Sequence, residues 1–430
     1  MRRVTRRRIE LPTAAVLISW LLTRAAMVAV VHWSGYPSPG AVTSDTRLYA
    51  SWAAILRTGH FPAADPSWQY PPGAGGVLLG PALTGLDYSA TFVALMLVVD
   101  LAVLLALLRR RHGSGGRRAA WTWVVGIVAV GPVALNRFDL VPTALAVAGV
   151  LVASPYAAGA LLGLGASVKL WPAVLLVGVR ERGTPVRTAG TMLVLGGAAL
   201  ATLAAVGRLG EALRFAAHTR DRGLQIESVA ATPYLLVHAF APDAGGLRIV
   251  RRYGAYEVVG RFVDLGVLLA TLATLVGLAA YALAAWRSRR GGGREDPAGL
   301  AFAAVLLLLV TSKVLSPQYL VWAVGVGAVT LLGTDQRHRR AVGLVVAAAA
   351  LSQGVFPGSY LSLLHARPAA VLLLTLRNLV LLTALLLVLR RTVTTARPGV
   401  PPPLHLPRRP HPRPPSVVGV ARTDDPTEPP

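Results

Sequence analysis

The feature that most constrains the fold is a succession of apolar segments, each near the length of a membrane span, separated by clusters of arginine. A helix needs about 20 predominantly apolar residues to cross the hydrocarbon core of a bilayer. Hydrophobic residues make up 54 % of the chain and charged residues only 14 %, which is low for a soluble domain. The pattern predicts an all-α polytopic membrane protein.

The arginine clusters orient the predicted helices, because positively charged loops tend to stay in the cytoplasm. Placing the clusters inside gives about 12 helices with both termini cytoplasmic. The preference for Arg over Lys and the abundance of Ala are typical of a GC-rich bacterium, whose plasma membrane is the expected location. The expected helices are 12–31, 88–108, 119–135, 139–153, 157–168, 170–180, 188–206, 262–286, 298–312, 317–333, 340–356 and 367–389.

The chain divides into three parts by composition. A basic cytoplasmic N-terminus, 1–11, precedes a transmembrane domain over 12–390. That domain contains a first outer loop, 32–87, and a long outer loop, 207–261. The tail 391–430 is rich in Pro and Arg, cannot build a packed core, and is predicted to be disordered and cytoplasmic.

Two stretches of the outer loops need separate interpretation. The Gly- and Pro-rich stretch 70–86 makes a weak helix, so it is predicted to be a juxtamembrane or re-entrant segment. The outer loop 207–261 carries eight Arg against the charge rule, which long loops obey poorly. These arginines attract anionic lipid headgroups, or they recognise a phosphorylated substrate; the sequence leaves both readings open.

The high positive charge of the chain does not by itself indicate a nucleic-acid partner. The net charge of +24 is compatible with nucleic-acid binding, but the Arg clusters fall between apolar runs, which is the pattern of helix orientation. We therefore expect no nucleic-acid partner. The chain has no Cys, so it has neither disulfides nor cysteine metal sites.

Lysine occurs only at Lys169 and Lys313, each inside an apolar stretch and beside a Trp-Pro or Ser-Pro step that interrupts a helix. A cation at membrane depth is costly and marks a pathway, a partner or an anionic ligand. The alternative is that each lysine reaches the interface along its own stem. Two lysines at two helix breaks favour a shared anion site.

The polar residues gather in the loops assigned to the outer face, whereas the cytoplasmic loops hold mainly Arg. No Walker-type or dinucleotide-binding glycine pattern is present. Nucleotide-sugar donors and ATP are cytoplasmic. Chemistry at the outer face therefore needs a donor carried in the membrane, such as a sugar on a polyprenyl phosphate.

Five segments carry a resemblance to a known family. In order, they are TSDTRLYASWAAILRTGHFPAADPSWQYPPGAG, NRFDLVPTALAV, GALLGLGASVKLWPAVLLV, RGLQIESVAATP and SKVLSPQYLVW. Together they resemble glycosyltransferase family 87, the polyprenyl-phosphate-mannose-dependent α-mannosyltransferases of the GT-C superfamily. The resemblance covers 12–390 and implies a GT-C-type helical bundle with juxtamembrane helices in its outer loops.

The resemblance also implies a reaction. A sugar, expected to be mannose, moves with inversion from a polyprenyl-phosphate carrier to a lipid or glycan hydroxyl of the cell envelope, on the extracytoplasmic face. Phosphate is already a good leaving group, so one carboxylate suffices to accept the proton of the acceptor. Asp45 matches the acidic position of the first loop and is the expected base. It could instead cap a helix over 46–58. Asp65 is the reserve candidate, although its Ala-Asp-Pro context also fits a turn.

Cations should stabilise the charge that gathers on the departing phosphate. The expected phosphate contacts are Lys169, Lys313, Arg137 and Arg222. The expected sugar or acceptor contacts are Tyr70, Asp139, Gln225, Glu227, Gln318 and Tyr319. Asp139 could alternatively form a structural pair with Arg137.

Other side chains receive more ordinary readings. His218 and His238 are expected to be loop residues, and Trp68 and Trp171 either stack on sugar or anchor at the membrane interface. Within the spans, three charged residues are expected to neutralise one another, namely Arg24, Asp100 and Asp264.

No cofactor is implied, and the reaction is expected to be independent of metal, because the chain has no Asp-X-Asp, no His pair at helical spacing and no carboxylate cluster. Some members of the family carry histidines soon after the Ser-Pro of the last segment. The run that follows Ser316-Pro317 here has none, so the acceptor and the sugar stay open.

Two competing functions use the same features. A multi-pass transporter or flippase for a phosphorylated lipid-linked substrate also has broken helices and buried cations. Against it, the halves of the chain show no convincing repeat, and the polar residues gather at the outer edge. A catalytically inactive scaffold of the same fold is the third reading.

Overall fold

The computed structural model describes residues 13–109, 115–178, 184–242, 246–290, 296–333 and 336–394. The predicted basic N-terminus, 1–11, and most of the predicted tail lie outside the described residues. Of that tail, the range 391–394 is described and continues the last helix.

Six helices in this part of the chain are long and apolar enough to cross a membrane, judged by length and composition. They are α1 (Thr13–Val30), α4 (Tyr88–Leu108), α8 (Thr184–Ala205), α11 (Val263–Arg290), α14 (Arg339–Gln353) with its π-helical extension η6 (Gly354–Gly358), and α16 (Pro368–Thr394). The predicted helical membrane protein is confirmed. The predicted number of about 12 spans stays a prediction.

The other helices are shorter or less apolar. They are α2 (Pro39–Leu56), α3 (Gly73–Ala82), α5 (Gly115–Val130), η1 (Pro132–Ala134), α6 (Leu140–Leu151), α7 (Pro155–Val168), η2 (Trp171–Gly178), α9 (Leu209–Arg220), η3 (Val229–Ala231), α10 (Thr232–Phe240), α12 (Pro297–Thr311), η5 (Pro317–Tyr319), α13 (Leu320–Thr330) and α15 (Tyr360–Leu364).

The two helix breaks predicted at the lysines are present, and local chemistry explains them. The Oγ of Ser154 accepts a hydrogen bond from the N–H of Ala157 and caps the start of α7. At its other end α7 stops at Val168, because Pro172 lacks a backbone N–H and restricts the residue before it. Lys169 thus lies between two helices, and Lys313 follows the end of α12 in the same way.

The segment 207–261 contains a small antiparallel sheet that the sequence analysis did not anticipate. Its strands are β1 (Leu224–Gln225), β2 (Arg248–Arg252) and β3 (Ala255–Val259), in the order β1-β3-β2. Tyr253 and Gly254 join β2 to β3 and both have positive φ, as a tight hairpin turn requires.

The helices are sorted by burial. Every residue of α13 and most residues of α12 are buried. In contrast, α8 and α11 expose large apolar side chains such as Leu193 and Leu275. A helix that is apolar on all sides belongs in a core or in lipid. The exposed faces of α8 and α11 are therefore the surface that a bilayer would cover.

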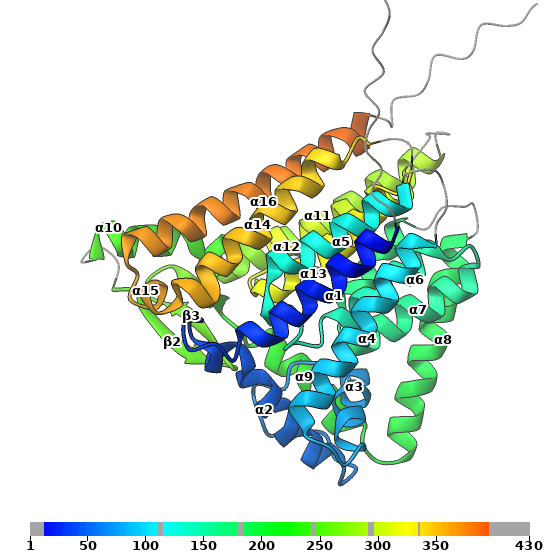
Figure 1. Cartoon of the computed structure of the whole chain (residues 1–430), viewed down its shortest axis with the longest axis horizontal. Helices are drawn as coiled ribbons and strands as arrows, with labels where there is room; N and C mark the ends of the chain where they lie inside the picture. The colour runs from blue at the N-terminus through cyan, green and yellow to red at the C-terminus, as the bar shows by residue number, and fades with distance from the viewer. Residues whose placement is uncertain are drawn as a thin grey trace, which may run out of the picture.

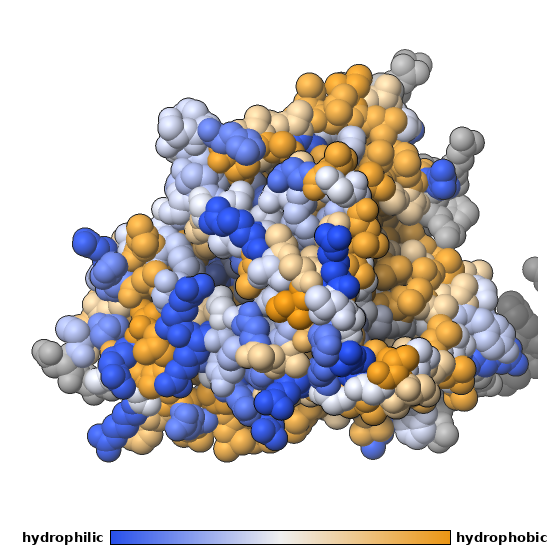
Figure 2. All heavy atoms as spheres, turned by 90° about the horizontal axis from the view of Figure 1, so that it is seen from below, coloured by the Kyte–Doolittle hydropathy of each residue, from blue (hydrophilic) through white to orange (hydrophobic). Residues whose placement is uncertain are grey.

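The connecting elements gather at one end of the bundle. Figure 1 shows α2, α3, α9 and the hairpin β2–β3 at the end opposite the start of α1 and the end of α16. Figure 2 views the molecule from below, where hydrophilic side chains collect around a hollow. This end carries the polar residues that the sequence analysis singled out.

Candidate functional site

Two adjoining cavities hold almost all of the predicted site residues. The first, which we call the carboxylate cavity, has a volume of about 400 Å³ and contains both Asp45 and Glu227 in its wall. The second, which we call the lysine cavity, has a volume of about 240 Å³ and contains both lysines. The residues common to both walls are Gln69, Tyr70, Arg222 and Tyr319.

The structure distributes the predicted residues between these cavities. Those in the carboxylate cavity alone are Asp45, Arg137, Gln225, Glu227 and Gln318. Lys169 and Lys313 line the lysine cavity, and Tyr70, Arg222 and Tyr319 line both. Asp139 lines neither cavity.

Asp45 projects from α2 and forms an ion pair with Nη1 of Arg137. Arg137 lies in the turn between α5 and α6, where burial lowers its pKa to about 10, so that it stays protonated at neutral pH. The alternative reading of Asp45 as a helix cap is wrong. The helix begins earlier, at Pro39 with Ser38 as its N-cap residue, because proline is preorganised for the first turn.

Lys169 is buried and its Nζ lies 2.7 Å from Oδ1 of Asp139. The same oxygen accepts a hydrogen bond of 2.7 Å from Nε1 of Trp322. The predicted pair of Asp139 with Arg137 is therefore wrong. Asp139 precedes α6 directly, and this position turns its carboxylate towards the Lys169 break, while Arg137 is taken by Asp45.

Aromatic rings surround the ammonium group of Lys169. The distances from Nζ to the ring centroids are 4.2 Å for Tyr319, 5.0 Å for Trp322, 5.5 Å for Phe138 and 5.7 Å for Tyr70. Rings at this distance attract a cation through their electron-rich faces. Trp171 stacks on Trp322 at 5.0 Å and extends this aromatic wall into the lysine cavity.

Lys313 holds the loop that carries Arg222. Its Nζ donates hydrogen bonds of 2.8 Å to the backbone carbonyls of Arg220 and Arg222. Burial and the nearby guanidinium of Arg222 lower the pKa of Lys313. Two of the three ammonium protons are therefore engaged by the backbone, which leaves one for a ligand.

Arg222 stands in the shared wall of the two cavities. Its Nη1 donates to Oε1 of Gln69 at 2.8 Å, and its Nε lies 3.4 Å from Oε1 of Glu257. Its Nη2 is buried without a hydrogen-bond partner in the described residues. An anion bound at the shared wall would satisfy this remaining donor.

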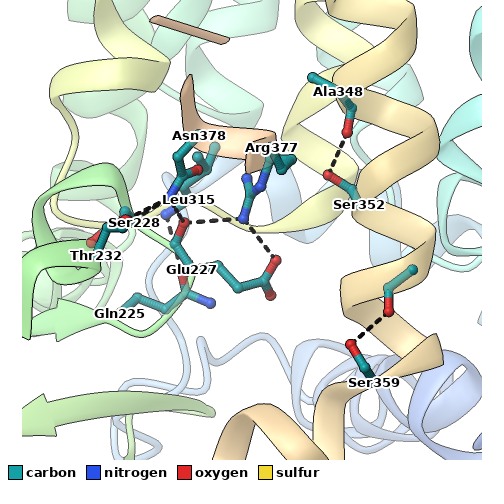
Figure 3. Close-up of polar contacts among 11 residues, drawn as sticks. Gln225, Glu227, Ser228, Thr232, Leu315, Ala348, Ser352, Ser359, Arg377 and Asn378 are labelled. Carbon is teal, nitrogen blue, oxygen red and sulfur yellow. Dashed lines mark hydrogen bonds and ion pairs between the residues drawn. The ribbon is translucent and has the colours of Figure 1, made fainter. Parts of the chain in front are cut away.

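Gln225 is the last residue of β1 and Glu227 lies just beyond it, but the two side chains make different contacts. The backbone N–H of Gln225 donates to the carbonyl of Lys313 at 3.0 Å, and its Oε1 accepts from the N–H of Leu315 at 3.2 Å. Gln225 thus connects β1 to the loop that contains Lys313. Oε2 of Glu227 lies 3.2 Å from Nη2 of Arg377. Figure 3 draws this ion pair as a dashed line.

Three residues of the site escaped the sequence analysis. Arg377 lies within an apolar run of α16, and a cation in such a run was a usable signal. Glu257 sits in β3 and Arg251 in β2, where Arg251 lines the carboxylate cavity. Neither could be found from sequence, since only the pairing of the strands brings them to the site.

The structure also locates Asp65, the second candidate for the base, and the residues that were predicted to have ordinary structural roles. Asp65 accepts hydrogen bonds of 2.8 Å from Nε1 of Trp52 and from the N–H of Ser67, which is the turn geometry expected as its alternative. His218 contacts the carbonyl of Trp68 at 3.0 Å. The ring of Trp68 is fully buried, so it cannot stack on a ligand.

The predicted neutralisation within the spans is partly confirmed. Arg24 and Asp100 form a buried ion pair, with Nε 2.8 Å from Oδ2 and Nη2 3.1 Å from Oδ1. Asp264 is exposed in the first turn of α11, so its predicted place in this buried cluster is wrong. The helix begins at Val263, which leaves Asp264 at the bundle end rather than inside it.

Among the described residues, no three His, Asp or Glu side chains come together in a group that could hold a metal ion. Most of the charged groups of the site form four ion pairs. The pairs are Asp45–Arg137, Asp139–Lys169, Glu257–Arg222 and Glu227–Arg377.

Comparisons with known proteins place this geometry in context. No curated protein matches the chain. The fold is similar to that of ArnT from Cupriavidus metallidurans bound to undecaprenyl phosphate, with a TM-score of 0.43 and 14 % sequence identity over 90 % of this chain and 79 % of that chain. The family model of glycosyltransferase family 87 matches residues 68–317, which is more than half of the sequence. The chain therefore belongs to glycosyltransferase family 87, as its five segments predicted.

Proposed function

We propose that this membrane glycosyltransferase moves a sugar from a polyprenyl-phosphate carrier to a hydroxyl of a lipid or glycan. The proposed sugar is mannose. Membership of the family supports sugar transfer. The proposal places the reaction on the extracytoplasmic face of a bacterial plasma membrane, with both termini in the cytoplasm. The Arg clusters between the helices support this orientation.

The lysine cavity is suited to the phosphate end of the donor. Lys313 and Arg222 supply positive charge, and Lys169 adds a cation already paired with Asp139. Apolar side chains such as Leu308 and Leu309 line the same cavity. Cations beside apolar side chains match a phosphate attached to a prenyl chain, since each part meets its own chemistry.

The carboxylate cavity is suited to the acceptor. In the proposed step, an acceptor hydroxyl attacks the anomeric carbon and forms the new glycosidic bond. The bond between that carbon and the phosphate oxygen breaks, and its electron pair leaves with the phosphate. The acceptor proton passes to the Asp45 carboxylate, and Arg222 stabilises the charge on the departing phosphate. Attack from the face opposite the phosphate inverts the anomeric centre.

The observation that carries the proposal is the position of Arg222, whose side chain lines both cavities. A phosphate bound there would lie on the lysine side of the wall, and its sugar would reach the carboxylate side. The aromatic rings of Tyr70 and Tyr319, which also belong to both walls, offer the flat surfaces that sugars pack against.

The test uses sealed membrane vesicles given polyprenyl-phosphate mannose with a radiolabelled sugar. We expect label in a lipid or glycan product with the wild-type protein, and about tenfold less label with Arg222→Met at a donor concentration well below the KM. Arg220→Gln is the matched control, because the exposed Arg220 side chain pairs with the exposed Asp221 outside both cavities, and Arg220 contributes only its backbone carbonyl to the site. Label that crosses the bilayer without transfer would instead establish a transporter or flippase.

A further inference from the structure

The carboxylate of Glu227 is held by an arginine from the last long helix. Glu227 is only 1 % exposed, yet it lines the carboxylate cavity. Nη2 of Arg377, on α16, donates to Oε2 of Glu227 at 3.2 Å and to its backbone carbonyl at 3.0 Å. Figure 3 shows Arg377 reaching from α16 to both oxygens.

The next residue of α16 fixes the same segment. Nδ2 of Asn378 donates to Oγ1 of Thr232 at 2.8 Å, and it lies 3.5 Å from the backbone carbonyls of Glu227 and Ser228. Two consecutive side chains of α16 therefore hydrogen-bond to the segment that leads into η3 and α10. These contacts fix the backbone from which the Glu227 carboxylate projects.

The buried ion pair between Glu227 and Arg377 is not an efficient way to stabilise the fold. Arg377 is fully buried, and its Nε and Nη1 have no hydrogen-bond partner among the described residues. Buried donors without partners lower stability, and an apolar pair of similar volume is often at least as stable as a buried ion pair. The cost points to a use for the Glu227 carboxylate at the cavity wall.

We propose that Arg377 is a positioning residue, which fixes the Glu227 carboxylate at the carboxylate cavity so that this carboxylate accepts hydrogen bonds from hydroxyls of the acceptor. The inference rests on the proposed function and deepens it. It adds a residue beyond the range 68–317 that the family model matches. It also assigns Glu227 to the acceptor rather than to the donor.

The electrostatic surroundings of Glu227 agree with this role. Burial raises its pKa to about 7, while the Arg377 guanidinium and a hydrogen bond from Gln225 oppose the rise. The Tyr360 hydroxyl, from α15, also lies close enough to Glu227 for the carboxylate to raise the pKa of the tyrosine. Glu227 is therefore partly ionised at neutral pH and depends on Arg377 to remain so.

The experiment measures the KM for donor and for acceptor separately, with purified protein in lipid nanodiscs. The donor is polyprenyl-phosphate mannose. The acceptor probes are octyl mannoside, octyl glucoside and octyl galactoside, and the one that the wild-type protein uses best is carried forward. The variants are Glu227→Gln, Arg377→Lys, Arg377→Met and the double variant E227Q/R377M. Arg24→Lys is the matched control, because Arg24 belongs to a buried ion pair outside both cavities.

We expect E227Q and R377M to raise the acceptor KM by roughly tenfold or more, as the loss of a charged hydrogen bond does. The donor KM should change less than about twofold, R377K should recover part of the loss, and the double variant should be no worse than E227Q. R24K should keep the wild-type acceptor KM. If the wild-type enzyme is active but E227Q and R377M keep its acceptor KM, the inference fails while the proposed function stands. A folded wild-type protein that transfers sugar to no acceptor would overturn both.

Discussion

The Nζ of Lys169 lies 2.7 Å from Oδ1 of Asp139, inside a cage of four aromatic rings. The lysine is therefore neutralised by a neighbour before any ligand arrives. A phosphate that reaches it would meet a cation shared with a carboxylate. In the proposed function, Lys169 would therefore contact phosphate more weakly than Arg222, whose ion pair with Glu257 is longer, at 3.4 Å, and whose buried Nη2 lacks a partner in the described residues.

The pair between Lys169 and Asp139 predicts a stability effect. Asp139→Asn or Lys169→Met leaves one buried charge without its partner, which costs about 3–5 kcal/mol for a buried pair. The double variant K169M/D139N removes both charges and should be more stable than either single variant. Thermal unfolding of the detergent-solubilised protein, followed by tryptophan fluorescence, measures the difference. Strictly additive losses would show that the pair is not coupled.

Lys313 should act through Arg222. Lys313→Met frees the backbone carbonyls of Arg220 and Arg222, so the loop that carries Arg222 loses its anchor. We expect the donor KM to rise about tenfold, which corresponds to one charged hydrogen bond. The measurement is the initial rate against donor concentration for K313M, R222M and K313M/R222M. Equal losses in all three indicate one functional unit, whereas independent contributions multiply and would argue against this dependence.

Glu227 should impose a pH dependence near neutrality. Its pKa is raised to about 7 by burial, so the carboxylate is protonated below that pH and ionised above it. The ionised form accepts more hydrogen bonds, so the acceptor KM should fall as the pH rises through about 7. Glu227→Gln should show no such transition, because the carboxyl group whose raised pKa produces it is absent from that variant.

The raised pKa of Glu227 also predicts how the stability of the folded protein changes with pH. The folded-state pKa lies above the ordinary value of 4.5, so ionisation of Glu227 opposes folding. The stabilising contribution is complete below about pH 4.5 and is lost as the pH rises through about 7. As the pH rises from about 4.5 to above 7, the melting temperature of the wild-type protein should decline relative to that of E227Q. A parallel pH profile for the two proteins would contradict the assignment.

Removal of divalent metal should leave transfer intact. In the proposed step, Arg222 and the two lysines carry the charge stabilisation that a metal ion supplies in other phosphoryl systems. We expect the rate in excess EDTA to stay within about twofold of the rate with added Mg²⁺ or Mn²⁺. A loss of activity in EDTA that Mn²⁺ restores would require a metal in the reaction.

The sequence predicted the helices well where one signal dominates. The predicted range 88–108 coincides with α4, since Asp87 caps its start and the apolar run defines its length. The boundary predicted at 135 was less accurate. The helix α5 ends at Val130, because Gly131 adopts a positive φ and turns the chain.

The sequence singled out most of the residues that line the two cavities together, but it did not predict how their charged side chains pair. Charged side chains within or beside apolar runs stand out by their cost, which drew attention to Lys169, Lys313 and Arg24. Their partners depend on how distant segments pack. Asp139 lies close to both Arg137 and Lys169, and only the fold decides that Asp45 takes Arg137. The contribution of the hairpin β2–β3 also needed its three-dimensional register.

The most direct test of the account is the rate of sugar transfer by Asp45→Asn at saturating donor. The account predicts a loss of about 10²–10⁴-fold, typical of a missing general base, with an unchanged donor KM. Asp264→Asn, which removes an exposed carboxylate at the start of α11, should transfer at the wild-type rate. A folded D45N protein that keeps a rate within a few-fold of wild type would contradict the central role of this carboxylate.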